Sequence, residues 1–214
     1  MVLPLPVPPG SAENVVRFID LSAYPEFFDL LDLAFRIRRS DGTFLEARLG
    51  LGAPLVIHKV GCFEASFVPT RQDFARLDQR FRLPDDVWQA LPGYDDWGFA
   101  VFKLRRMSRR TDIHPMAFEF PLRNPDRLFF PTVHVHNGRV EPLATFDHVL
   151  YCQDVDDTRR EGWSKSFHSE SRWETSDPLG AVFGADHAEG IVQPDRPCHR
   201  VPIRGSYANV DVVI

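Results

Sequence analysis

Cysteine is scarce in this sequence: Cys62, Cys152 and Cys198 are the three among 214 residues, and no two form a CxxC pair. An odd, sparse set of this kind excludes a disulfide framework and a zinc knuckle. We therefore expect reduced thiols in a cytoplasmic protein. Long apolar runs are also missing, since none approaches the roughly 20 residues that cross a bilayer.

The first ten residues, MVLPLPVPPG, contain four prolines and no positive charge. A secretory signal needs a positive start and an uninterrupted apolar stretch, so we do not expect one here. The segment instead predicts a Pro-rich arm or an edge strand.

An excess of basic charge is also lacking. Lys and Arg number 25 against 30 Asp and Glu, which gives a net charge of −5 and no global attraction to nucleic acid or to a membrane surface. The one basic run, Lys103 to Arg110, has no interleaved aromatic residues and predicts a solvated loop. No G-x-S-x-G, P-loop or G-x-G-x-x-G motif occurs. Asp154 opens a segment that begins like a calcium loop, but Lys165 stands where the loop needs Glu.

Phenylalanine and proline are abundant, with 18 residues of each. Aromatic residues along the whole chain argue against disorder, and prolines along the whole chain argue against a helical bundle. We expect one globular domain over 1–214, with a helix-containing part (1–92), a strand-rich part (93–214) and a phenylalanine-rich core. Its fold class is α+β, predominantly antiparallel sheet with two to three short helices concentrated in residues 1–91.

Hydrophobic spacing predicts the individual elements. Helices are expected at 25–37, after Thr70 and at 85–91. Strands are expected at 15–21, 43–51, 55–68, 97–105, 115–121, 128–136, 143–152 and 198–214, with Gly61 as a bulge or bend and Asn137-Gly138 as a hairpin signal. Pro131 lies inside one of these strands and demands an edge or a bulge there.

One group of residues is a candidate for chemistry: His134-Val135-His136, followed by Glu141. On a strand both imidazoles point to the same face. If Asn137-Gly138 forms a two-residue turn, Glu141 lies opposite His134, and directly opposed Cβ atoms are about 4.5–5.5 Å apart. Two imidazoles and a carboxylate suit Zn, Fe or Mn and leave an open coordination position.

The H-x-H-x4-E pattern resembles the first metal motif of the cupin family. That resemblance implies a jelly-roll barrel and a further histidine from a later strand, for which His148 or His187 is the candidate. Gly184 to His187 matches a G-x2-H fragment of the second cupin motif. Leu128 and His148 stand where the family has flanking glycines, and two helices before residue 91 fit a jelly roll poorly.

Two alternatives stay open for this region. With a longer loop over 137–142, Thr132 would face Asp147 and His134 would face Thr145, so Glu141 would leave the patch. The histidines are otherwise surface or half-buried residues, hydrogen-bonded to their neighbours.

The protein is thus expected to be a non-enzymatic module that binds a protein or a small molecule. The alternative is a metal-dependent enzyme with ligands from His134, His136, Glu141, His148 and His187. Thiol catalysis is disfavoured, because two of the cysteines lie in apolar runs and Cys198 and His199 point to opposite faces of a strand.

Overall fold

Antiparallel strands dominate the computed structural model of this chain. It describes residues 1–36, 58–77, 93–105, 113–135, 139–154, 157–165, 170–183 and 187–214, together with 79, 82, 83, 85–89 and 91. The strands are β1 (Val2–Leu5), β2 (Arg17–Ile19), β3 (His58–Val60), β4 (Phe63–Val68), β5 (Gly98–Leu104), β6 (Ala117–Glu119), β7 (Phe129–Phe130), β8 (Leu143–Cys152), β9 (Glu174–Pro178), β10 (Pro197–Ala208) and β11 (Val212–Val213). The helices are α1 (Phe27–Ala34), η1 (Arg71–Arg76), α2 (Asp85–Gln89), α3 (Asp157–Glu161), η3 (Gly162–Lys165), α4 (Gly180–Phe183) and α5 (His187–Gly190). The predicted α+β class with a predominance of antiparallel sheet is confirmed.

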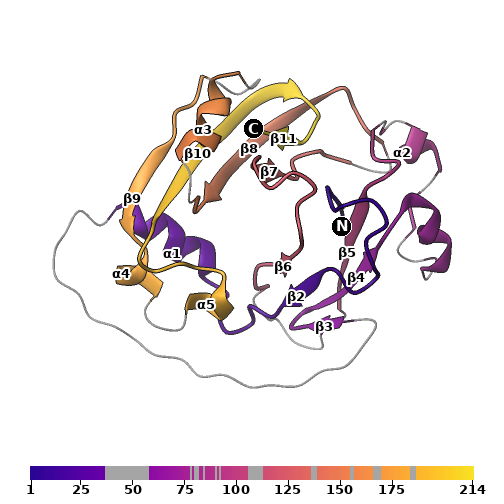
Figure 1. The fold of residues 1–214 in the computed structure, drawn as a ribbon, viewed down its shortest axis with the longest axis horizontal. Coiled ribbons are helices and arrows are strands. Elements are labelled where there is room, and N and C mark those ends of the chain that lie inside the picture. The colour runs from indigo at the N-terminus through magenta and orange to yellow at the C-terminus, as the bar shows by residue number, and fades with distance from the viewer. Residues whose placement is uncertain are drawn as a thin grey trace.

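The described strands form four sheets. A four-stranded sheet has the order β1-β5-β4-β3, a three-stranded sheet has the order β8-β10-β9, and β11-β7 and β2-β6 are two-stranded. In Figure 1 the four-stranded sheet lies at the right, the three-stranded sheet lies at the upper left with α1 nearby, and the two short pairs lie between them. This arrangement differs from the two packed sheets of a jelly roll, which the cupin resemblance implied.

The N-terminal segment is an edge strand, one of the two forms predicted for it. β1 pairs only with β5, and Pro4 stands opposite Phe99 in that register. Proline has no N–H to donate to a sheet, so an edge is where a strand tolerates it. Leu5 is fully buried, which anchors the strand.

The long strand expected at 55–68 is instead a hairpin over its described residues. β3 and β4 pair antiparallel with Val60 opposite Phe63, and Gly61 and Cys62 form the turn between them. Gly61 has a φ of +53°, a left-handed conformation that glycine adopts without steric cost. The glycine therefore reverses the chain rather than bending one strand.

The expected helices are present in the described residues. α1 buries Phe27, Leu31 and Ala34, the face that the spacing predicted. Thr70 precedes η1, where its hydroxyl donates to Asp73, but the helix is of the 3-10 type. Short helices α3, η3, α4 and α5 also form within 157–190, beyond residues 1–91, where the expected helices were concentrated. The predicted strand at 43–51 lies outside the described residues, as does the predicted basic loop Lys103 to Arg110 from residue 106 on, whereas Lys103 and Leu104 belong to β5.

Phenylalanine builds much of the core, as expected. Phe102 packs edge-to-face on Phe18, with ring centroids 5.5 Å apart, and joins β2 to the four-stranded sheet. Phe74 of η1, Trp88 of α2 and Phe99 of β5 form a second cluster, with centroids 4.8 to 5.2 Å apart. Such pairs each contribute about 0.5–1.5 kcal/mol beyond the area that they bury.

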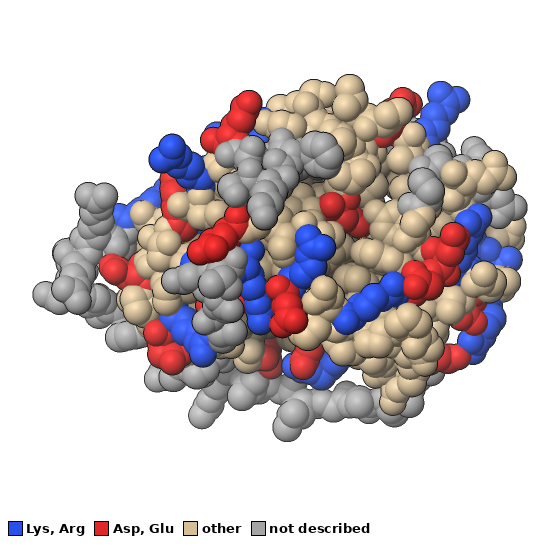
Figure 2. Space-filling model, turned by 45° about the horizontal axis from the view of Figure 1, so that its top comes forward, with Lys and Arg blue, Asp and Glu red and all other residues tan. Residues whose placement is uncertain are grey.

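Charged side chains of both signs are interspersed on the face shown in Figure 2. A mixed surface creates no strong single-sign field, in keeping with the modest net charge. Among the described residues, no helix has the length and apolar character that crossing a bilayer requires.

Candidate functional site

The structure brings two of the predicted site residues together, His134 and His148. Their Nε2 atoms are 2.8 Å apart, which is hydrogen-bond distance. His148 lies in the middle of β8, opposite Ile203 of β10, and points to the same side of the sheet as the buried Phe146. The ring of Phe146 lies 4.8 Å from that of His134, so both imidazoles pack against an aromatic surface.

The segment that carries His134 is not the strand predicted over 128–136. β7 ends at Phe130, and Pro131 to Val135 have no regular secondary structure. Pro131 offers no N–H to continue the ladder with β11, which explains where the strand stops. We expected a sheet edge or a bulge at Pro131, and the structure instead ends the strand just before it.

Side chains from the C-terminal region replace the missing ladder. The carboxylate of Asp211 accepts hydrogen bonds from the backbone N–H groups of Thr132, at 2.8 Å, and Val133, at 2.9 Å. Asn209 continues the series: its Oδ1 accepts from the N–H of His134 at 2.7 Å, and its Nδ2 donates to the carbonyl of His134 at 2.8 Å. These bonds supply the backbone of 132–134 with the hydrogen-bond partners that a neighbouring strand would otherwise provide.

The turn on which both hairpin registers considered from the sequence depend, residues 136–138, lies outside the described residues, and neither Thr132 nor His134 belongs to a described strand. Over its whole length β8 pairs with β10, from Leu143 opposite Ala208 to Cys152 opposite His199. β7 pairs instead with β11. Both pairings join segments far apart in the chain, so local turn chemistry did not indicate them.

Of the remaining predicted ligands, the structure describes the side chain of Glu141. The carbonyl of Glu141 accepts a hydrogen bond from Asn209 Nδ2 at 2.9 Å, while Glu141 itself is exposed. His136 lies outside the described residues, as does the side chain of His187 on α5. Within the described part of the chain, no group of three or more His, Cys, Asp or Glu side chains is arranged to hold a metal ion.

Tyr94, which precedes β5, extends this network. Its hydroxyl donates to the second oxygen of Asp211 at 2.8 Å. Burial, together with the neighbouring Asp211 charge, raises the pKa of Tyr94 well above its usual range, so the phenol stays protonated. Burial also raises the pKa of Asp211, although the three hydrogen bonds that it accepts oppose that shift.

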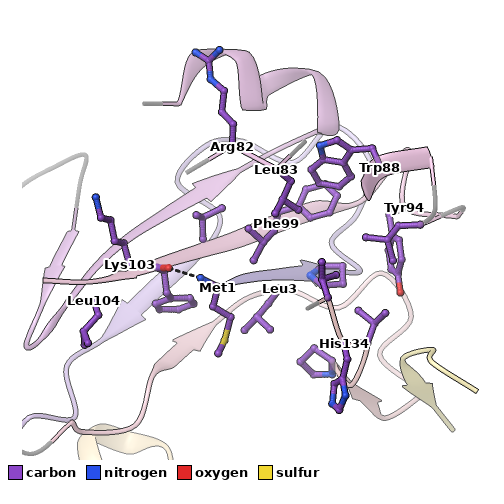
Figure 3. Close-up of a pocket in the computed structure, with 18 of the residues that line it drawn as sticks. Met1, Leu3, Arg82, Leu83, Trp88, Tyr94, Phe99, Lys103, Leu104 and His134 are labelled. Carbon is purple, nitrogen blue, oxygen red and sulfur yellow. Dashed lines mark hydrogen bonds between the residues drawn. The ribbon is translucent and has the colours of Figure 1, made fainter. Parts of the chain in front are cut away.

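A cavity of about 760 Å³ opens beside the paired histidines. β1, α2 and β5 contribute one wall, and residues 131–135 with His148 contribute the other. Figure 3 shows Leu3 and Phe99 toward the middle of the view, with Trp88 at the upper right and His134 at the lower right, while Arg82 lies at the top and Lys103 at the left. Most of the lining is aliphatic or aromatic.

The polar groups of the cavity are all neutral or basic. Its described lining includes His134, His148, Tyr94, Arg82 and Lys103, and it includes no Asp or Glu. Arg82 donates to backbone carbonyls of residues 75 and 77, so its charge is partly engaged there. Lys103 stands opposite Glu64 in the register of β4 and β5.

Burial affects the acidity of two of the three cysteines, Cys152 and Cys198. All three are free. Burial raises the pKa of Cys152 to about 12 and that of Cys198 to about 11. Since the thiolate is the nucleophile, neither residue supplies one near neutral pH.

Sequence reasoning missed Tyr94, Asn209 and Asp211, which position His134. The available signal was the pair of polar residues in the otherwise strand-like run 207–214 (YANVDVVI). Polar side chains that are buried need hydrogen-bond partners, and here those partners are the backbone groups of 132–134.

No protein-family model matches the chain, and neither a curated protein nor a solved structure is significantly similar to it.

Proposed function

We propose that this protein is a soluble, cytoplasmic, non-enzymatic binding module whose cavity takes a small, largely apolar molecule. The observation that carries the proposal is the cavity itself, at about 760 Å³. Pockets for small molecules occupy about 300–1,000 Å³ and combine apolar walls with a few polar groups that orient the ligand. Leu3, Trp88 and Phe99 supply apolar walls here, and the paired histidines supply polar groups.

A neutral fluorescent probe tests this proposal. N-phenyl-1-naphthylamine is apolar and gains fluorescence when it leaves water, so wild-type protein is expected to bind it saturably. Val135→Trp adds a large side chain at the cavity wall, where Val135 is half-buried, and should abolish probe binding. Val149→Trp is the matched control, because Val149 is exposed on the outer face of β8. Equal probe binding by all three proteins, or by none, contradicts the proposal.

A metal-dependent enzyme acting on a small molecule is the second candidate. It is supported by the convergence of His134 and His148, whose Nε2 atoms are 2.8 Å apart. A zinc ion with Zn–N distances of about 2.0–2.1 Å and tetrahedral angles needs nitrogens about 3.3 Å apart, so a small shift of the rings would admit it. Further ligands would come from His136, Glu141 or His187.

Elemental analysis of purified protein separates the two candidates. The enzyme hypothesis expects about one metal ion per chain in the wild type and a loss of that metal in His134→Ala and His148→Ala. Substoichiometric metal in the wild type contradicts it.

A further inference from the structure

We propose that the ligand of the cavity is a short apolar peptide, which adds as a further strand to the open edge of β1. This inference rests on the proposed function, because it names the ligand class of the same cavity.

The first argument is the direction of the backbone groups of β1. Met1 and Phe102 exchange two hydrogen bonds: the nitrogen of Met1 donates to the carbonyl of Phe102 at 2.8 Å, and the N–H of Phe102 donates to the carbonyl of Met1 at 2.9 Å. Along an antiparallel pair, residues of this kind alternate with residues whose backbone groups point away from the partner strand. The N–H and carbonyl of Val2 and the carbonyl of Pro4 therefore point away from β5.

The second argument is that these outward groups lie at the cavity without partners. Val2 is half-buried, Pro4 is buried, and both line the cavity. In Figure 3, Phe99 lies above Leu3 and His134 lies below it, on the side away from β5. Within the described part of the chain, no residue forms a hydrogen bond with the outward groups of Val2 and Pro4. Since buried backbone groups in native proteins are nearly always paired, a ligand that pairs them is favoured.

The third argument is that a peptide matches this set of groups. The N–H and carbonyl of one residue in an extended chain point to the same side. One residue of an extended ligand can thus donate to the carbonyl of Val2 and accept from its N–H. Peptide-binding domains that add a strand to a sheet edge gain affinity from such main-chain bonds, and specificity from the pockets for alternate side chains.

The fourth argument is that both faces beside β1 suit apolar side chains. Side chains of an added strand alternate between the two faces of the sheet. Val2 packs with Trp88 and Phe99 on one face, and Leu3 packs with Phe102 on the other. All five of these residues line the cavity. Successive apolar side chains of a peptide therefore meet apolar walls in both directions.

Displacement of the neutral probe by two matched peptides tests the inference. One is N-acetyl-Leu-Val-Leu-methylamide, which carries no charge, and the other is its analogue with a methyl group on every amide nitrogen. An apolar cavity that does not use the strand edge prefers the methylated analogue, which has more apolar area and no N–H to take out of water. We expect the opposite: half-displacement at a concentration of the unmethylated peptide lower by about tenfold, the effect of one or two hydrogen bonds.

Val2→Pro locates the preference, because it removes the outward N–H and no hydrogen bond to β5. Pro4 shows that this edge accommodates proline at an outward position. The ratio of the two half-displacement concentrations should fall by about threefold or more in this variant, the effect of one lost hydrogen bond.

Lys59→Pro is the matched control. Lys59 lies on β3, the opposite edge of the same sheet, and is not among the described residues that line the cavity. Val60 and Phe63 close a two-residue turn, so the N–H of Lys59 also points away from the neighbouring strand. The ratio should be the same in Lys59→Pro as in the wild type.

Each outcome is decisive. Equal displacement by the two peptides, a preference for the methylated analogue, or a preference for the unmethylated peptide that Val2→Pro leaves unchanged overturns the inference. If Val2→Pro fails to fold, as judged by its thermal unfolding, hydrogen exchange of the Val2 N–H in the wild type decides: the unmethylated peptide should slow this exchange, and an unchanged rate overturns the inference. A wild type that binds neither the probe nor the peptide overturns the proposed function as well. Binding of the probe without a preference for the unmethylated peptide overturns only the ligand class.

Discussion

Gly61 and His114 are in such close contact that a Cβ atom on Gly61 would overlap the imidazole ring. The ring bridges two segments: Nε2 accepts a hydrogen bond from the backbone N–H of Cys62 at 3.0 Å, and Nδ1 donates to the carbonyl of Pro115 at 2.8 Å. One nitrogen accepts and the other donates, so the buried ring is neutral with its proton on Nδ1. This histidine therefore has a structural role and joins the β3–β4 turn to the segment before β6.

Gly61→Ala should destabilise the fold by about 2–5 kcal/mol. A left-handed conformation costs a residue with a Cβ atom roughly 1–2 kcal/mol, and displacing the ring would leave the buried N–H of Cys62 without an acceptor, at about 1–3 kcal/mol. Urea denaturation measures the change. Gly10→Ala is the matched control, since Gly10 also has a positive φ, of +75°, but no atom within 4 Å of the added Cβ. Equal losses in the two variants would show that the contact with His114 carries no energy.

Asp211→Ala should cost about 3–5 kcal/mol, because the backbone N–H groups of Thr132 and Val133 and the hydroxyl of Tyr94 all lose their acceptor. Asp211→Asn keeps an acceptor oxygen for the backbone and should cost less than about 1.5 kcal/mol. Tyr94→Phe should cost about 1 kcal/mol, the value of a single hydrogen bond. Denaturant titrations of the three variants check this ranking, and similar losses for the Ala and Asn variants would contradict it.

The raised pKa of Asp211 has a consequence for the pH dependence of stability. The folded chain holds this proton more tightly than the unfolded chain does. Protonated Asp211 therefore contributes to the free energy of unfolding. This contribution is fully present below the unfolded pKa of about 3.9 and is lost as pH rises through the folded pKa. Wild type should lose unfolding free energy relative to Asp211→Asn as the pH is raised from about 3 to about 7. Paired denaturation curves measure the difference, and a constant or growing advantage of the wild type excludes this account.

Arg200 holds α1 against the three-stranded sheet. Its guanidinium lies 2.5 Å from Asp32 of α1 and 2.7 Å from Glu174 of β9, and it stacks 4.3 Å from the ring of Phe35. The Arg200 side chain is 22% exposed, so Arg200→Met should cost about 1–3 kcal/mol. Arg204→Met is the matched control: the pair of Arg204 with Asp147 is largely exposed, and such pairs contribute about 0–1 kcal/mol. Thermal or chemical unfolding measures the loss of unfolding free energy in both variants. The prediction is wrong if Arg204→Met loses as much as Arg200→Met.

Thiol labelling tests the chemistry of the cysteines. Because burial raises the pKa of Cys152 to about 12 and of Cys198 to about 11, both should react with a disulfide reagent far more slowly than a free thiol at pH 8 and should react fully in guanidinium. Cys62 is also buried and should share this behaviour. Rapid labelling of any of the three in the folded protein would indicate an accessible, activated thiol.

The sequence predicted correctly the elements in which buried residues recur at one regular spacing, either that of a helix or that of a strand. α1 appeared where Phe27, Leu31 and Ala34 share a face, and β8 has the predicted bounds because apolar and polar residues alternate along it. Gly61 was recognised as irregular, but its effect was misjudged: a run of β-branched and aromatic residues around a glycine fits one bent strand or two paired strands equally well. The pairing of β3 with β4 decides between them.

The site depended on information that no local pattern holds. His134 and His148 were both named, but their contact requires β8 to pair with β10 and requires Asn209 and Asp211 to hold residues 132–134. The residues of β8 lie 47 to 65 positions from their partners in β10, and residues 132–134 lie 75 to 79 positions from theirs. The metal site involving His136, Glu141 and His187 stays a prediction. The cavity was not predicted at all, because its walls come from α2, β1, β5 and the 131–135 segment together.

The hydrogen bonds from Asn209 and Asp211 also set an order of events during synthesis. Residues 132–134 leave the ribosome well before residues 209–211 do, and until then their backbone N–H groups have only water as a partner. The strands of the four-stranded sheet, and His114 that accepts the hydrogen bond of its β3–β4 turn, all precede residue 132, so this sheet can form earlier. A nascent chain that stalls before Asn209 would thus carry a folded β1-β5-β4-β3 sheet with one wall of the cavity still open, and its apolar surface would be exposed to chaperones.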